Sequence, residues 1–161
     1  MEQPLITVAM SAHNASATVG LAVQSILTQT YQHWELIIVD DGSTDRTAEI
    51  LSEIQEPLGN FGLASRLNQC VRLARGQYIA RMDADDVAYP HRLERQVQYL
   101  EEHRDIDLLG TGAVIFKGDG EMVGRYPTAC SHETICRRPW WGFPLAHPTW
   151  MGKRTWFVAH P

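Results

Sequence analysis

Apolar residues along the chain follow two patterns, short continuous runs and longer stretches with a spacing of three or four. Compact apolar runs at residues 5–10 and 35–40, and a shorter one at 78–82, are typical of buried strands. Helical spacing follows the first run at Val19, Val23, Ile26 and Leu27, and the second run at Ala48, Leu51 and Ile54. Strands that alternate with helices predict an α/β fold with a mostly parallel sheet and flanking helices.

The later part of the chain shows the same two apolar patterns. One helix is predicted with Leu63, Leu67, Val71 and Ala74 on its buried face and an end at Gly76, and another from Pro90 with Leu93, Val97 and Leu100. Residues 106–116 are predicted as one strand region, followed by a turn at 118–120 and a strand at 122–126. Ser16 is the expected N-cap of the first helix, and Ser43 or Thr44 that of the second. Residues 57–62 form a breaker segment, so no strand is predicted there.

Composition narrows the class of protein. A chain of 161 residues with 44% hydrophobic and 20% charged residues suits a single globular domain. The net charge of -5 argues against a general nucleic-acid binder, so no nucleic-acid partner is expected. The sequence has neither a run of about 20 apolar residues nor a recognisable signal peptide. Its three cysteines lack a CxxC spacing, and reduced thiols favour the cytoplasm.

Candidate chemistry gathers where the predicted strands end. Asp83, Asp85 and Asp86 follow the strand at 78–82, and ligands of open α/β sheets bind at the carboxyl ends of strands. Neighbouring carboxylates repel one another unless water or a cation compensates. Hard oxygen ligands suit Mg²⁺ or Mn²⁺, which bring substrate phosphates with them. Acidic turns and N-caps are the plainer alternative for such a run.

The first two strands end at the same edge of the predicted sheet. They deliver four polar residues there: Ser11, His13, Asp40 and Asp41. This convergence with the acidic run favours a ligand site over a chance cluster of turn residues.

Four segments together resemble the family 2 glycosyltransferases, inverting enzymes with the GT-A fold. They are SAHN after the first strand, VDDGSTDRT after the second, ARGQYIARMDADD, and YPHRLERQV. The match is dense over residues 5–112 and weaker to about 154. The resemblance implies metal-assisted transfer of a sugar, with inversion, from a nucleotide-diphosphate donor to an acceptor hydroxyl. It also implies Mg²⁺ or Mn²⁺ as cofactor, a UDP-sugar as the favoured donor, a carbohydrate or lipid-linked acceptor, and a role in polysaccharide or cell-envelope biosynthesis.

The resemblance also assigns residues. It implies a nucleotide-binding set of Ser11, His13, Asn14, Asp41, Arg66 and Asp83. Asp85 would be the main metal ligand, with Asp83 beside it. Asp40 would shape its turn, and Asp86 would support the loop or cap the next helix.

Residues 1–116 are expected to form the donor-binding core, and 117–161 the start of an acceptor-side region that is truncated. The family's third strand is missing from the prediction, and no acidic residue follows Glu133. The catalytic base is therefore unidentified and expected beyond Pro161. The expected location is the cytoplasm, with the inner face of the membrane as an alternative.

Aromatic residues crowd the last part of the chain: Trp140, Trp141, Phe143, Trp150, Trp156 and Phe157. They are interpreted as core or edge cover, with a sugar-binding face or a membrane or partner contact as alternatives. His147 and Cys70 are interpreted as structural.

Three other functions stay open. A nucleotide-sugar-binding module without catalysis would explain the missing base. A phosphohydrolase with the pattern DxDxV would use Asp83 as nucleophile and Asp85 as acid, and a dinucleotide-binding fold is the third. Zinc bound by Cys130, His132 and Cys136 lacks a fourth ligand at a suitable spacing.

Overall fold

A computed structural model describes residues 3–58, 61–64, 67–118, 120–126, 131–136 and 145–160, with residues 55–58, 61–64 and 67–69 described by backbone alone. The strands are β1 (Ile6–Ala12), β2 (Trp34–Asp40), β3 (Phe61–Ala64), β4 (Tyr78–Asp83), β5 (Leu108–Leu109), β6 (Ala113–Phe116), β7 (Met122–Tyr126) and β8 (Met151–Lys153). The helices are α1 (Val19–Leu27), α2 (Thr47–Leu58), α3 (Leu67–Leu73), α4 (Arg92–Glu102), α5 (His132–Cys136), α6 (Arg154–Ala159) and the 3₁₀ helix η1 (His147–Thr149).

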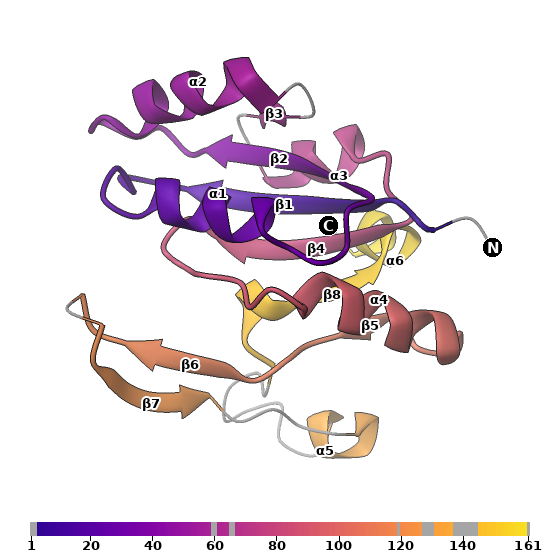
Figure 1. Cartoon of the computed structure of the whole chain (residues 1–161). Coiled ribbons are helices and arrows are strands. Elements are labelled where there is room, and N and C mark those ends of the chain that lie inside the picture. Colours follow the sequence, from indigo (N-terminus) through magenta and orange to yellow (C-terminus); the bar gives the residue numbers. More distant parts are fainter. Residues whose placement is uncertain are drawn as a thin grey trace.

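The main sheet has the strand order β3-β2-β1-β4-β8-β5 (Figure 1). β1 pairs in parallel with β2 and β4, β2 pairs in parallel with β3, and β8 runs antiparallel to β4 and β5. The sheet is therefore mostly parallel, and the predicted α/β class is confirmed.

Helices cover both faces of this sheet. The larger core packs alternate residues of β1 and β4 against α1, α2 and α4, and its members include Met10, Met82, Ile26, Leu51 and Leu100. The smaller core packs the opposite face against α3 and α6, and its members include Ala9, Ile37, Ile79, Cys70 and Phe157. Because side chains alternate between faces along a strand, both faces of the central strands are apolar, as expected for a covered parallel sheet.

The hairpin of β6 and β7 forms a separate two-stranded sheet beside the main one (Figure 1). Several large apolar side chains on it are exposed: Ile115, Phe116, Met122, Val123 and Tyr126. The boundary expected after residue 116 falls in this hairpin, and β8 returns to the main sheet. The division into donor and acceptor sides stays a proposal about function.

The prediction for residues 54–74 was wrong in two places. Phe61–Ala64 is not breaker and helix but the strand β3, which pairs with β2 and supplies the third strand that the sequence analysis did not find. α2 runs to Leu58, so Pro57 stands in its last turn, and α3 begins only at Leu67. A four-residue edge strand with a glycine carries too little apolar pattern to be told from a loop.

Residues 106–116 form two strands rather than one. β5 joins the main sheet and β6 the hairpin, so the chain leaves one sheet for the other between them. β8 and α6 were not predicted. They are short elements whose apolar residues pack against a sheet built by distant segments.

The expected N-caps were also wrong. α1 begins after Thr18, and no side-chain cap bond forms there. α2 is capped by Asp45, whose carboxylate accepts hydrogen bonds from the main-chain and hydroxyl groups of Thr47. α4 begins after His91, so Asp86 does not cap it. Every described helix is too short or too polar to cross a lipid bilayer.

A buried carboxylate fixes the sheet at the edge where the parallel strands begin. Glu35 accepts hydrogen bonds from the Thr7 hydroxyl (2.6 Å), the Arg75 main-chain N–H (2.7 Å) and the Arg75 Nε (2.7 Å). The Gly76 N–H donates to the same Thr7 hydroxyl (3.0 Å). β1, β2 and the turn before β4 are thus joined at one point, which helps to set their register.

We expect Gly76→Ala to destabilise the protein by about 2 kcal/mol, because the new Cβ would overpack a rigid site. That atom would lie 2.5 Å from the Thr7 nitrogen and 2.8 Å from the Tyr78 carbonyl oxygen, both main-chain atoms. Urea unfolding monitored by circular dichroism measures the loss. The control is Gly20→Ala in α1, which meets nothing within 4 Å and should stabilise by roughly 0.5–1 kcal/mol. Equal effects of the two variants would contradict the prediction.

Glu35 should make stability depend on pH. Burial alone would raise the pKa of its carboxyl, but hydrogen bonds from Thr7 and Arg75 and the charge of Arg75 lower the pKa below its ordinary value of 4.5. Stabilisation by the ionised group is therefore complete above that value and is lost as the pH falls through the folded-state pKa. Urea unfolding of wild type and Glu35→Gln should differ most near pH 7, and the difference should shrink in acid. Glu102→Gln, at an exposed position, should show no such convergence.

Candidate active site

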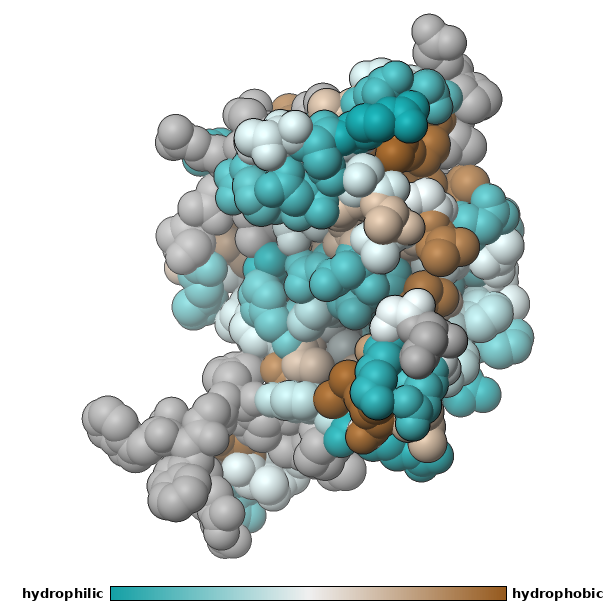
Figure 2. All heavy atoms as spheres, turned by 90° about the vertical axis from the view of Figure 1, so that its left-hand side faces the viewer, coloured by the Kyte–Doolittle hydropathy of each residue, from teal (hydrophilic) through white to brown (hydrophobic). Residues whose placement is uncertain are grey.

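The carboxyl ends of β1, β2 and β4 bring the predicted polar residues together. In the parallel register, Ser11 lies opposite Asp83, and Ala12 lies opposite Asp40. The Ser11 hydroxyl donates to a carboxylate oxygen of Asp83 at 2.7 Å. Figure 2 looks onto this edge and shows hydrophilic residues across the middle of the surface.

The loop after β1 is bonded to the loop after β2. His13 donates from Nδ1 to the main-chain oxygen of Asp41 (3.0 Å), and its Nε2 accepts from the Asn14 amide (3.2 Å). The Asn14 main-chain N–H donates to Ser43 Oγ (3.0 Å), and its side-chain oxygen accepts from the Thr44 N–H (2.9 Å). Asn14 has a φ of 49°, a left-handed conformation that asparagine tolerates better than most residues.

The two aspartates at the end of β2 have different surroundings. Asp40 accepts from the Ser43 N–H (3.0 Å) and Ser43 hydroxyl (2.6 Å), which closes the turn at Gly42, where φ is 72°. The expectation that Asp40 shapes this turn is therefore confirmed. The side chain of Asp41 is exposed at the rim, and in the described part of the chain its carboxylate has no recorded bond. Asp41 is thus available to a ligand, whereas one oxygen of Asp40 is taken by the turn.

Three carboxylates extend from the end of β4. Asp85 and Asp86 are exposed, whereas Asp83 is half-buried. Partial withdrawal of the Asp86 carboxyl from water, together with the charges of Asp85 and Asp83, raises its pKa. Among the described residues, no three acidic, histidine or cysteine side chains converge as a ready-made metal cage. Mg²⁺ sites commonly use one or two carboxylates and complete the shell with phosphates and water, so the donor set here fits such an ion.

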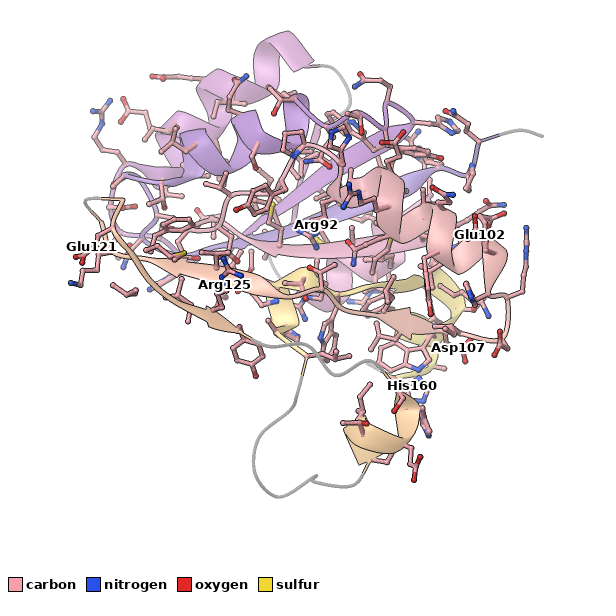
Figure 3. All side chains as sticks on the ribbon, turned by 60° about the horizontal axis from the view of Figure 1, so that its bottom comes forward. Arg92, Glu102, Asp107, Glu121, Arg125 and His160 are labelled. Atoms are coloured by element: carbon pink, nitrogen blue, oxygen red, sulfur yellow. The ribbon has the colours of Figure 1, made fainter. Side chains whose placement is uncertain are left out.

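A half-buried arginine fixes this end of β4 to the segment before β8. Arg92 donates to the main-chain oxygens of Arg81 (2.6 Å) and Pro148 (3.0 Å) and to the Gln96 side chain (3.1 Å). Burial lowers its pKa to about 10, so the group stays charged at neutral pH. Figure 3 shows Arg92 at the start of α4, far from Glu102 at the other end of that helix.

Arg81 and His147 form a further pair at this edge. Arg81 donates from a terminal nitrogen to His147 Nε2 at 2.6 Å. Partial burial and the charge of Arg81 lower the pKa of His147, which favours the neutral ring that this bond requires. In the sequence analysis Arg81 was only a strand residue. The signal that could have revealed it is its place two residues before Asp83, on the same face of the strand.

The structure thus brings five of the predicted site residues to one edge: Ser11, His13, Asn14, Asp41 and Asp83. Asp85 follows them directly on the exposed loop, and Arg66 lies outside the described residues. The functional roles of all seven stay predictions.

The cysteines and aromatic residues noted in the sequence lie partly in the smaller core. Cys70 is fully buried, and burial raises the pKa of its thiol to about 11, as expected of a core cysteine. Phe157 is buried in the smaller core, with Trp150 and Trp156 packed against it, whereas Trp140, Trp141 and Phe143 lie outside the described residues. Cys136 contacts His132 at 3.4 Å without a third ligand among the described residues, and Cys130 lies outside them.

A shallow hollow of about 480 Å³ lies along the hairpin, lined by Gly112, Ala113, Val114, Arg125 and Tyr126. Arg125 is labelled on the hairpin in Figure 3. None of the predicted site residues that the structure describes lines this hollow, which is therefore treated separately from the carboxyl-edge site.

The family model described as "Glycosyl transferase family 2" matches residues 7–159. The putative glycosyltransferase EpsE of Bacillus subtilis is 37% identical over 158 residues, which cover 92% of this chain and 56% of that protein. The chain therefore spans about half the length of this curated relative.

Solved structures share the fold at lower identity. Staphylococcus aureus TarS 1–349 in complex with UDP has a TM-score of 0.71 and 19% identity, over 96% of this chain and 48% of that one. The mannosyltransferase PcManGT from Pyrobaculum calidifontis, in complex with GDP-Man and Mn²⁺, has a TM-score of 0.61 and 22% identity, over 72% and 36%. These likenesses confirm the GT-A type of α/β fold.

Proposed function

Because the chain belongs to glycosyl transferase family 2, we propose that its carboxyl-edge site binds a nucleoside-diphosphate sugar for transfer to an acceptor hydroxyl, with inversion and with the help of a divalent cation. The membership makes a glycosyltransferase the enzyme class. The observation that carries the finer proposal is the Ser11–Asp83 bond at the edge where the two nucleoside-side loops also meet.

The proposal assigns the nucleoside to the tips of β1 and β2. His13 and Asn14 join the two loops through hydrogen bonds. Their partners are Asp41, Ser43 and Thr44, so this part of the site is preorganised without a ligand. Asp41 presents an exposed carboxylate that can accept a hydrogen bond from a base, and Ser11 and Asp83 lie next along the edge, where the ribose would follow. Arg66 is proposed as a donor contact on the resemblance alone.

The proposal assigns the metal to Asp85, with Asp83 as its neighbour. Asp85 is exposed and has no recorded bond among the described residues, so both of its oxygens can bind a cation. Mg²⁺ or Mn²⁺ at this position would offset the charge that develops on a diphosphate leaving group. The half-buried Asp83 is held by Ser11 in one orientation, which leaves its second oxygen for the ion or the ribose.

The nucleotide part of the donor is proposed to be UDP, with uracil as the base. The fold likeness to TarS in complex with UDP supports this choice. The acceptor is proposed to be a carbohydrate or lipid-linked hydroxyl in polysaccharide or cell-envelope biosynthesis. A cytoplasmic location is part of the same proposal. The acceptor, the pathway and the location are proposals about the whole protein, because the chain spans about half the length of its curated relative.

A second candidate is donor binding without transfer by this chain. It is favoured by the absence of acidic residues after Glu133 in the sequence, since transfer with inversion needs a carboxylate base. Incubation of the chain with UDP-sugar and Mn²⁺ separates the two candidates. Release of UDP supports transfer or donor hydrolysis, and binding without release supports the second candidate.

We expect Asp85→Ala to abolish the part of UDP binding that depends on Mn²⁺, because the main metal ligand is lost. Titration calorimetry with UDP, with and without Mn²⁺, measures that part. The control is Asp105→Ala, which also removes one negative charge. Asp105 lies in the sequence between Glu102 and Asp107, which Figure 3 places beyond the end of α4 that is far from Arg92. The metal assignment fails if Asp85→Ala binds UDP with Mn²⁺ as tightly as the control does.

We expect Asp41→Ala to weaken uridine and UDP binding even without metal. A lost hydrogen bond to a charged acceptor costs ~1.5–3 kcal/mol, and the exposed side chain should not affect folding. Calorimetry in EDTA measures this, with Asp41→Asn as the variant that keeps an acceptor oxygen. Unchanged affinity in Asp41→Ala would remove this residue from the site.

A further inference from the structure

Arg81 points to the carboxyl edge, on the far side of Asp83 from the loops of β1 and β2. Its main-chain N–H donates to the Trp150 oxygen (2.7 Å), next to the antiparallel pairing of Ala80 with Met151. Because β8 is antiparallel to β4, the step back from Trp150 to His147 leads toward the end of β4. The bond from Arg81 to His147 therefore carries the guanidinium toward the level of Asp83.

The guanidinium has donors left over. Its Nε is buried and has no acceptor in the described part of the chain, where Arg81 also has no recorded ion pair. Its recorded side-chain acceptor is the neutral ring of His147. Arg81 as a whole is half-buried, and its buried Nε without an acceptor is costly unless a ligand group completes the site. The negative charge of Asp83 is close enough to act on the pKa of Arg81, which it raises against the effect of burial. The Asp83 carboxylate nevertheless bonds to Ser11 and not to Arg81.

The order of groups along the edge indicates which anion suits Arg81. Asp41 and the His13–Asn14 loop come first, the Ser11–Asp83 pair second, and Arg81 with His147 third. A nucleoside diphosphate laid along this edge with its base at the first position presents its ribose and inner phosphate at the second. The outer phosphate then reaches the third position, and it is an anion that accepts several N–H donors.

We propose that Arg81 binds the distal phosphate of the nucleoside diphosphate and that His147 positions it for this contact. The inference rests on the proposed function, since it takes the donor to lie on this edge. The His147 ring acts through Arg81: it gives the guanidinium a neutral acceptor other than Asp83. Asp83 and Asp85 then stay available to the cation, and the unused N–H groups of Arg81 stay available to the phosphate.

The first test compares ligands that differ by the distal phosphate. Arg81→Met should weaken UDP binding in Mn²⁺ by about tenfold or more, while UMP binding in Mn²⁺ changes by less than about twofold. Arg81→Lys, which keeps the charge but not the fork of donors, should fall between wild type and Arg81→Met for UDP. Titration calorimetry gives the affinities, and UMP binding doubles as the check that the variant is folded.

A fall of equal size for UMP and UDP would make Arg81 merely structural, and no fall for either would remove it from the site. Both results overturn the inference and leave the proposed function in place. Absence of UDP binding by the wild-type chain in Mn²⁺ would instead overturn the proposed function, and this inference with it.

The second test concerns His147. In His147→Ala the guanidinium loses its acceptor and should turn to Asp83, so the Mn²⁺ concentration needed for half-maximal UDP binding should rise several-fold. His147→Gln keeps an acceptor oxygen and should stay near wild type. The double variant Arg81→Met/His147→Ala should regain the wild-type Mn²⁺ requirement at a lower UDP affinity. A double variant with the raised requirement of His147→Ala would overturn the positioning role.

Discussion

The parallel register of β1 between β2 and β4 is the constraint on which the site depends. It sets Ser11 opposite Asp83 and Ala12 opposite Asp40, so three strand ends stop at the same level. A slip by one residue would turn every side chain of the strand to the other face. Such a slip would bury Ser11 in place of an apolar neighbour and separate it from Asp83. The site is therefore specified by the same apolar alternation that fills the two cores.

Opposite ends of this sheet treat their carboxylates differently. At the amino edge, Glu35 is almost fully buried, with partners from Thr7 and Arg75 that lower its pKa. At the carboxyl edge, partial burial and then the charges of Asp85 and Asp83 raise the pKa of Asp86. A saturated carboxylate supports the fold, and an unsaturated group of carboxylates is a place that a cation can stabilise. The contrast between the two edges is what distinguishes a structural acid from a site here.

The sequence sufficed for the fold class, for the central elements and for the acids at the strand ends. Long periodic stretches such as the one that became α4 were predicted because their apolar spacing alone determines the buried face. β3 and β8 were missed since elements of three or four residues are stabilised by pairing with distant strands rather than by their own pattern. The caps failed for a similar reason: Ser43 and Thr44 bond to Asp40 and Asn14, and this leaves the cap of α2 to Asp45. Local preference cannot rank such alternatives when the competing partner lies in another loop.

Two arginines contact the last part of β4, Arg81 from the strand itself and Arg92 from α4, and only the folded chain reveals how they differ. Arg92 donates to three protein acceptors and fixes β4 to the segment that contains Pro148. Arg81 is bonded through its main chain to that same segment, yet its side chain has one recorded acceptor and a buried nitrogen without any. In sequence both are basic residues near an acidic run, and no pattern separates them. The number of recorded acceptors does: Arg92 has three in the described part of the chain and Arg81 has one. Arg81 therefore has more N–H donors left for an anion at the edge of the site.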